Sequence, residues 1–375
     1  MPCCGKIHNG EILRLVSGFA PAESRRINIF IMKRHGNLYN KITEMENLEL
    51  AFILSARGKR WQHKVQKAEK KKDELLKKLQ ELLIRREFKT APYRTKILYE
   101  PKRREAHVLP FYPDRITHHA VMNVVIPIWL PYFYKHVYGC IPGRGQQAAS
   151  TQCMRFVHKY RYCAQLDVRH FFASINHEIM MRIIRKKIKD KDVLGWFDEL
   201  IKSTGGDKGI GLGNFPSPWM GNLYLNELDQ EIIKRFPNIG YERYCDDMLA
   251  FSNSKLEARQ AADFIESFLL NKLKLTLSAK RVYPTSQGVD FVGYRHFPNG
   301  KILVRKSTAA RMKRKIRAIP WLVKHRKLSL SQARSTLASI TGWMKWANSY
   351  NLRMKTDIDE MIKVVTEFDK LQRVC

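Results

Sequence analysis

Two adjacent aspartates, Asp246 and Asp247, lie between two apolar and aromatic runs at residues 239–243 and 248–251. Alternation of this kind predicts a strand, a tight turn that carries the acids, and a second strand. Adjacent carboxylates repel each other, which raises the free-energy cost of ionising both. A buried hairpin with this pair is therefore expected to hold a cation. Two divalent metal ions about 3.5–4 Å apart that bind a phosphoryl group would be cations of this kind.

A third carboxylate, Asp167, ends an apolar stretch at residues 161–168 and precedes a turn into a helix. If the two strands are neighbours, Asp167 meets the pair on the hairpin. Such a trio can bind two Mg²⁺ ions, with Mn²⁺ as an alternative, around a nucleoside triphosphate. Two simpler roles stay open: Asp167 as a helix cap, and Asp247 as a structural partner rather than a direct ligand.

The charge of the chain predicts a polyanionic partner. Its 375 residues include 68 Lys and Arg against 35 Asp and Glu, a formal net charge of +33. Solubility usually needs a net charge of about 2–8 in magnitude. Nucleic acid is therefore the favoured partner and a membrane surface the weaker one. No apolar run is long enough for a transmembrane helix, and Lys70–Lys72 are assigned to a solvated helix face.

Seven cysteines are scattered along the chain without a Cys-x-x-Cys pair. This usage predicts free thiols in a reducing, cytoplasmic setting. Cys3, Cys4 and His8 have a poor spacing for metal ligands. The first residues lack the apolar core of a signal peptide, and no role is assigned to residues 1–31.

Hydrophobic periodicity predicts helices over residues 62–87, 118–128, 179–188, 193–202, 220–236 and 255–272. Short strands are predicted over residues 95–99, 106–109 and 161–168. Residues 305–375 are expected to be mostly helical and strongly basic. Helices and short strands in this mixture predict an α+β protein.

Six motifs, in order over about residues 40–300, resemble those of reverse transcriptases, and of the bacterial branch in particular. They are Pro110-Phe111 with Asp114-Arg115; residues 139–145; Leu166-Asp167 with Phe171-Phe172 and Ser174-Ile175; residues 209–218; Tyr244-Cys245-Asp246-Asp247; and residues 290–294. Residues 36–51 and 342–348 further resemble diversity-generating retroelement and defence-associated reverse transcriptases.

The resemblance implies an α+β right-hand polymerase with fingers, an RRM-like palm (antiparallel sheet plus helices) and a helical thumb. Residues 1–31 would be an N-terminal extension and 32–160 the N-terminal helices and fingers. Residues 161–297 would form the palm with the catalytic site, in which 177–205 are a helical insertion that packs with the fingers. Residues 298–375 would be the basic helical thumb.

The resemblance also assigns site residues. Asp167, Asp246 and Asp247 would be catalytic, and together with Val168 they would bind the metal ions. The residues implied for dNTP binding are Lys102, Arg104, Arg169, His170, Phe171, Phe172, Leu212, Gly213 and Lys280. Those implied for template and primer are Arg144, Gly145, Ser217, Tyr244, Cys245, Gly293, Tyr294, Arg305, Lys313 and Arg314.

Some of these roles have alternatives. Phe172 would lie under the incoming sugar and reject a 2′-hydroxyl, whereas Phe171 reads as the core residue of the pair. Arg104 is favoured over Lys102 for the triphosphate. Lys280 would protonate pyrophosphate or be a plain surface lysine. Trp343 and Trp346 would pack in a core more readily than stack on bases.

Leu212 departs from the family pattern, which has a glutamine at this position. Diversity-generating retroelement enzymes also carry an aliphatic residue there and copy adenines inaccurately, but they follow it with Ser-Gln rather than Ser217-Pro218. Low fidelity is therefore a hypothesis.

The sequence thus predicts an RNA-directed DNA polymerase that uses a structured noncoding RNA as template or scaffold, most consistent with bacterial antiviral defence. The alternatives are an error-prone diversity-generating retroelement enzyme and a catalytically inactive RNA-binding scaffold. A group II intron origin is less favoured because the C-terminal tail is short. The expected partners are the noncoding RNA, the cDNA product and dNTPs, with an accessory protein or a second copy as further candidates and no membrane.

Overall fold

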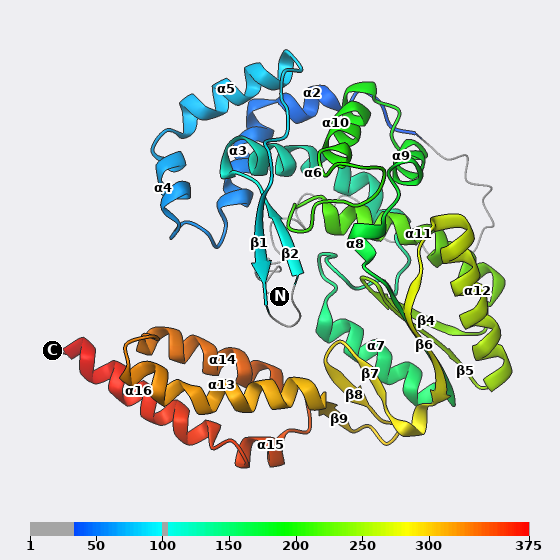
Figure 1. Ribbon diagram of the computed structural model, residues 1–375, viewed down its shortest axis with the longest axis vertical. Coiled ribbons are helices and arrows are strands. Elements are labelled where there is room, and N and C mark those ends of the chain that lie inside the picture. The colour runs from blue at the N-terminus through cyan, green and yellow to red at the C-terminus, as the bar shows by residue number, and fades with distance from the viewer. Residues whose placement is uncertain (1–33, 100–103, 375) are drawn as a thin grey trace. The chain divides into compact units, whose positions relative to one another are not determined.

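The computed structural model describes residues 34–99 and 104–374, and the structural statements below concern these described residues. The chain divides into two compact units, and both draw on separate segments of sequence. The first unit comprises residues up to 145, 166–237 and 261–280. The second comprises 146–165, 238–260 and 281–375. The predicted α+β class is confirmed (Figure 1).

The first unit begins with four helices: α2 (Tyr39–Thr43), α3 (Met45–Ala56), α4 (His63–Glu69) and α5 (Lys72–Ile84). The buried face of α3 includes Leu48 and Phe52, and the Phe52 ring meets Phe111 edge-on at 5.5 Å. The hairpin of β1 (Arg94–Leu98) and β2 (Arg104–Val108) follows, with Arg94 opposite Val108. Next come a π-turn (Phe111–Arg115), α6 (Ile116–Trp129) and a 3₁₀ turn (Leu130–Tyr132).

The prediction of one helix over residues 62–87 is wrong, because the chain leaves the helical conformation at Lys71 (φ −121°, ψ 24°). In a continuous helix Lys67 would lie beside Lys70 and Lys71, three and four residues further on. Like charges at this spacing repel each other and destabilise a helix by about 0.2–0.5 kcal/mol per pair. Asp73 and Glu74 lie in the first turn of α5, where acids stabilise a new helix N-terminus.

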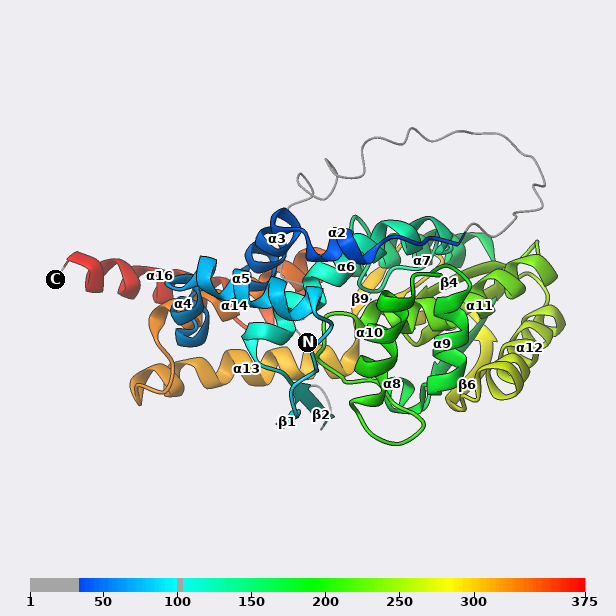
Figure 2. The ribbon, with the colours of Figure 1, turned by 90° about the horizontal axis from the view of Figure 1, so that it is seen from above.

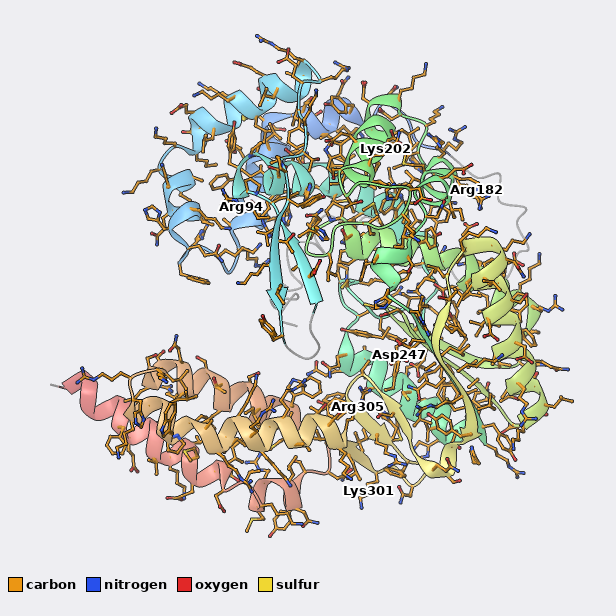
Figure 3. All side chains as sticks on the ribbon, in the orientation of Figure 1. Arg94, Arg182, Lys202, Asp247, Lys301 and Arg305 are labelled. Atoms are coloured by element: carbon orange, nitrogen blue, oxygen red, sulfur yellow. The ribbon has the colours of Figure 1, made fainter. Side chains whose placement is uncertain are left out.

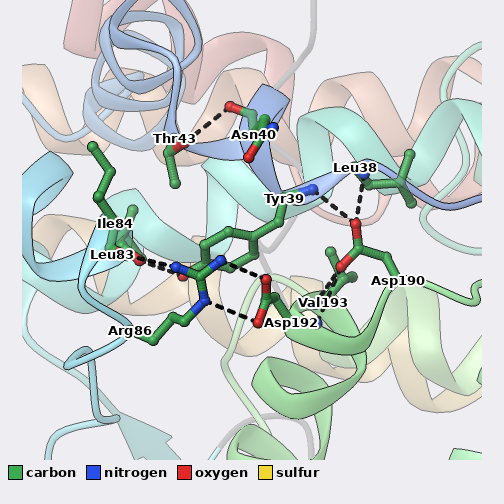
Figure 4. A network of polar contacts seen from close by, with 10 residues as sticks. All are labelled: Leu38, Tyr39, Asn40, Thr43, Leu83, Ile84, Arg86, Asp190, Asp192 and Val193. Atoms are coloured by element: carbon green, nitrogen blue, oxygen red, sulfur yellow. Dashed lines mark hydrogen bonds and ion pairs between the residues drawn. The ribbon is translucent and has the colours of Figure 1, made fainter.

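The first unit continues with α8 (Phe171–Ser174), α9 (His177–Arg185), α10 (Lys191–Lys202) and α11 (Ser217–Arg235). The carboxylate of Asp190 ties two helices of this unit together (Figure 4). Its Oδ1 accepts hydrogen bonds from the backbone of Asp192 and Val193 at 3.1 and 3.2 Å, which caps α10. Its Oδ2 accepts the backbone N–H groups of Leu38 and Tyr39 at 2.6 and 3.1 Å, at the start of α2.

A four-stranded sheet has the order β4-β5-β3-β6. Its strands are β3 (Tyr162–Val168), β4 (Gly240–Tyr244), β5 (Asp247–Ser252) and β6 (Leu277–Pro284). The helix α7 (Gln146–Lys159) packs against β4 in the second unit. The helix α12 (Lys255–Leu273) connects β5 to β6.

The second unit also holds a three-stranded antiparallel sheet, β7 (Val289–Phe291), β8 (Tyr294–His296) and β9 (Ile302–Val304). A helical bundle follows, made of α13 (Lys306–Lys324), α14 (Leu330–Lys345), α15 (Tyr350–Met354) and α16 (Ile358–Val374). Its core includes Ile316, Leu337 and Met344 (Figures 1 and 2). Within the described residues, no helix combines the length and apolar character needed to cross a membrane.

Replacing Asp190 with alanine should lower the free energy of unfolding by about 2 kcal/mol, because α10 loses its cap and α2 loses its anchoring acceptor. The matched control is Asp198→Ala in α10, whose carboxylate pairs with the exposed Lys202 at 2.7 Å. That change should cost less than about 0.5 kcal/mol. Urea unfolding of both variants is the measurement, and equal losses would contradict the double anchoring role.

Candidate active site

The β4–β5 hairpin positions the two acids of the second unit. Tyr244 pairs with Asp247, which leaves Cys245 and Asp246 as a two-residue loop. Cys245 has φ 55°, as the first loop residue of a tight hairpin requires. The fully buried guanidinium of Arg243 donates a hydrogen bond to the carbonyl of Cys245 at 2.8 Å. The predicted hairpin is therefore confirmed, and a buried arginine beneath it holds its turn.

Both acids of the hairpin are half-buried, and Asp247, labelled in Figure 3, begins the inner strand β5. Carboxylates in reach of solvent are suitable ligands for a hydrated Mg²⁺ ion. Three His, Cys, Asp or Glu side chains close enough to hold a metal are not found together in the described part of the chain. The hairpin supplies two of the predicted ligands.

Behind the hairpin lies Glu242, which is fully buried. Burial raises the pKa of Glu242 well above its usual range; the neighbouring Cys153 thiol lowers it, and the nearby charge of Asp247 raises it. Burial likewise raises the pKa values of Cys153 and Cys163. These thiols are therefore poor nucleophiles. The sequence reading assigned no role to Glu242, although a charged residue within a buried strand is the signal that identifies it.

Asp167 lies near the end of β3 in the first unit and is half-buried. The hydroxyl of Ser278 on β6 donates hydrogen bonds to its carboxylate and, at 3.3 Å, to its backbone carbonyl. The alternative of a helix-capping Asp167 is wrong, because His170 is the N-cap of α8. Asp246 and Asp247 belong to the second unit, and the meeting of all three acids at one metal site stays a prediction.

The predicted sugar-contacting residues follow Asp167. Phe171 is buried and Phe172 half-buried, with ring centroids 5.1 Å apart. The core position predicted for Phe171 is therefore confirmed. Gly221 on α11 makes room for both rings: an added Cβ would lie 3.0 Å from Phe171 and 3.2 Å from Phe172. The neighbouring Val168 is buried, whereas Arg169 and His170 are exposed.

The loop over residues 209–216 is fixed against the β1–β2 hairpin within the first unit. The carbonyl of Leu212 accepts the backbone N–H of His107 at 2.7 Å. Gly213 has φ 112°, and an added Cβ would lie 2.9 Å from the His107 carbonyl oxygen, so only glycine fits. Ser217 is buried and donates to the Gly211 carbonyl at 2.6 Å. In this structure Ser217 shapes the loop.

Tyr93, for which the sequence predicts no role, supports the loop over residues 209–216. Its hydroxyl accepts a hydrogen bond from Asn214 Nδ2 at 2.7 Å and lies 3.0 Å from the Ser203 hydroxyl. The Tyr93 ring also meets the His107 ring edge-on at 5.2 Å. Nothing in the local sequence distinguishes this tyrosine from a surface one.

Lys102, Arg104 and Arg144 are among the basic residues of the first unit that are predicted to bind the triphosphate or the template. Lys102 lies outside the described residues, and Arg104 begins β2 opposite Leu98. Arg144 donates to the carbonyls of Tyr134 and Val137 at 2.8 and 3.0 Å, so it fixes its own loop, while Gly145 is half-exposed.

Lys280 forms ion pairs with two acids of α12, Asp263 and Glu266. Burial acts to lower the pKa of Lys280, but its hydrogen bonds to these two acids raise it above the ordinary value. A raised pKa weakens the lysine as a proton donor, and the structural alternative gains support.

Gly293 and Tyr294 of the second unit contact the helical bundle. The Tyr294 ring stacks on Trp343 of α14 at 5.2 Å, and its hydroxyl donates to the Trp343 carbonyl at 3.1 Å. Gly293 has φ 87°, and an added Cβ would lie 2.6 Å from the Trp343 ring. The packing role predicted for Trp343 is confirmed. Trp346 is 36% exposed and donates to the Ser150 hydroxyl at 3.1 Å.

The remaining predicted residues also lie in the second unit. Arg305 precedes α13 and pairs with Asp290 at 2.5 Å. Lys313 is half-buried and Arg314 exposed on α13. Tyr244 and Cys245 are half-buried in the catalytic hairpin. Their contacts with template or primer stay predictions.

Comparison with known proteins identifies relatives of this chain. The family described as "Reverse transcriptase (RNA-dependent DNA polymerase)" matches residues 100–296. Protein YkfC of Escherichia coli K12 is 23% identical over 263 residues, which cover 56% of this chain and 66% of YkfC. The group II intron-encoded protein LtrA of Lactococcus lactis subsp. cremoris is 22% identical over 258 residues, which cover 50% of this chain and 43% of LtrA.

Among solved structures, apo telomerase from Candida tropicalis aligns with a TM-score of 0.46 and 11% identity. The alignment covers 76% of this chain and 59% of the telomerase chain. The chain thus spans less than two thirds of LtrA and of this telomerase, and about two thirds of YkfC.

The buried Glu242 predicts a pH-dependent stability. Because its pKa is higher in the folded than in the unfolded protein, the stability it contributes is present at low pH and is lost as pH rises above the ordinary glutamate value of 4.5. Glu242→Gln should therefore become more stable relative to wild type as pH rises. Urea unfolding at a series of pH values measures this. A difference that does not change with pH would show that folding does not raise the pKa of Glu242.

Proposed function

Because this chain belongs to the reverse transcriptase (RNA-dependent DNA polymerase) family, we propose that it copies an RNA template into DNA. Asp167, Asp246 and Asp247 are the proposed catalytic carboxylates. The strand order is the observation that carries the proposal. Strand β5, which Asp247 begins, neighbours β3, in which Asp167 is the residue before the last.

The donor set suits Mg²⁺, which prefers carboxylate oxygens and bound water. Bound at these acids, Mg²⁺ supplies activation of a primer 3′-hydroxyl and stabilisation of the departing pyrophosphate. The protein's own part is to hold the carboxylates still. Ser278 orients Asp167, and Arg243 fixes the turn that carries Asp246. A preformed arrangement of this kind lowers the reorganisation needed during reaction.

We propose that Phe172 selects deoxynucleotides. Its half-buried ring is held beside Phe171 and against Gly221, so it has little freedom to move aside. A rigid ring beneath the sugar leaves no room for a 2′-hydroxyl. This property disfavours an RNA-dependent RNA polymerase. The presence of all three acids disfavours an inactive RNA-binding scaffold.

For the biological role we propose a cytoplasmic enzyme of antiviral defence that uses a structured noncoding RNA. The motif resemblance of residues 36–51 and 342–348 supports this role, and the net charge of +33 supports an RNA partner. Leu212 favours the second candidate, a diversity-generating retroelement enzyme. The two roles differ in the accuracy of copying at template adenines.

Asp246→Asn and Asp247→Asn should each reduce dNTP incorporation on an RNA template with a DNA primer by at least about a hundredfold, because a metal's electrostatic stabilisation is worth several kcal/mol. Asp198→Asn, on the surface of α10, is the control and should keep full activity. Incorporation that is equal in all three variants would refute the assignment of the site.

Phe172→Val should raise the use of rNTPs relative to dNTPs by up to about a hundredfold, which is the usual limit for rejecting one hydroxyl by shape. Phe264→Val, a half-buried phenylalanine that packs against Phe236, is the matched control. Competition between labelled rNTP and dNTP measures the ratio. An unchanged ratio in Phe172→Val would exclude sugar selection by this ring.

A further inference from the structure

A pocket of about 520 Å³ opens in the second unit where the end of α14, the start of α15 and the chain before β9 come together. The pocket includes the end of the 342–348 motif, to which the proposed reaction gives no task. Its walls are formed by Lys301, Met344, Lys345, Ala347, Asn348, Ser349, Tyr350, Asn351 and Arg353. In Figure 3, Lys301 lies below Arg305, on the side of α15.

The walls of this pocket are fixed by hydrogen bonds. Asn348 bonds to Ile302 twice, since its backbone N–H donates to the Ile302 carbonyl at 2.7 Å and its side-chain oxygen accepts the Ile302 N–H at 2.8 Å. Ser349 donates to the Met344 carbonyl at 2.7 Å. That carbonyl at the end of α14 is therefore occupied within the protein. The pocket is a built feature, with Asn348 joining its two sides.

Positive charge dominates the lining. Lys301, Lys345 and Arg353 line the pocket, and no Asp or Glu does. Asp359 neutralises Arg353 through hydrogen bonds from the guanidinium. Among the described residues, Lys301 and Lys345 form no ion pair. These two ammonium groups therefore favour a ligand that carries negative charge.

An aromatic ring completes the lining. Tyr350 is 74% exposed, so its ring is open to solvent. A ring open to solvent beside two ammonium groups matches a nucleotide of a single strand, whose base can stack while its phosphates meet the cations. A protein partner would instead need a broad apolar surface, whereas the apolar side chains of this lining are Tyr350, Ala347 and the buried Met344.

We propose that this pocket binds a nucleotide of single-stranded RNA, with the base against Tyr350 and the flanking phosphates at Lys301 and Lys345. The inference rests on the proposed function, because the RNA that the enzyme copies or carries supplies the strand. The residues with predicted template and primer contacts, Arg305, Lys313 and Arg314, do not line this pocket.

The test is the binding of a short fluorescein-labelled single-stranded RNA to the full chain. Tyr350→Ala should weaken binding about tenfold, whereas Tyr350→Phe, which keeps the ring, should bind as wild type does.

The double variant Lys301→Gln with Lys345→Gln should lower the slope of log affinity against log salt by about 1.4, since each phosphate contact on a single strand contributes about 0.7. Lys324→Gln with Lys363→Gln removes the same charge outside the pocket and should leave the slope near wild type. Equal slopes in both double variants, or unchanged affinity in Tyr350→Ala, would overturn the proposal.

Cross-linking of wild type to RNA that carries 4-thiouridine gives a readout without a mutation. The cross-linked peptide should include Tyr350, and adenosine monophosphate should not protect it. Protection by the mononucleotide would show a free-nucleotide site and overturn the proposal.

Incorporation of dNTPs on a short primer–template by the same preparations separates this claim from the proposed function. If wild type forms the cross-link but incorporates no dNTPs, the proposed function is refuted and the pocket stands. If wild type incorporates dNTPs but forms no cross-link at Tyr350, the pocket is refuted and the proposed function stands.

Discussion

The hydrogen bond from the buried guanidinium of Arg243 to the carbonyl of Cys245 fixes the turn on which the proposed chemistry depends. A non-glycine residue with positive φ is strained by about 1 kcal/mol or more, and it persists where its surroundings hold it. Here the paired strands and the arginine together hold Cys245 at φ 55°. The consequence is a defined turn that carries Asp246 and leads into β5, which Asp247 begins.

Much of this arrangement is predictable from local sequence. Alternating apolar residues around two aspartates specify a hairpin, and the structure has strands Gly240–Tyr244 and Asp247–Ser252 there. The helices over 193–202 and 255–272 also match α10 and α12 within a residue or two. The break at Lys71 is not predictable from hydrophobic spacing, because that spacing continues across it, while repulsion between neighbouring lysines weakens a continuous helix.

The supporting contacts are less predictable because they join residues far apart in sequence. Ser278 bonds to Asp167 from a different strand, and Asp190 holds the start of α2 from a distance of about 150 residues in sequence. The raised pKa of Glu242 depends on the burial of its strand. Motif reading finds the groups that carry chemistry, whereas the groups that orient them follow from tertiary packing. The same holds for the pocket beside Tyr350, whose walls come from the residue before β9, the end of α14, the start of α15 and the segment between these two helices.

The proposed function requires Asp167 to act together with the hairpin acids at one metal site. Titration of the full chain with Mn²⁺, followed by electron paramagnetic resonance, measures this directly. We expect Asp167→Asn and Asp246→Asn each to weaken Mn²⁺ binding, and the double variant to be little worse than either single one because one site is lost. Binding that is unchanged in Asp167→Asn, or losses that simply add, would contradict a shared site.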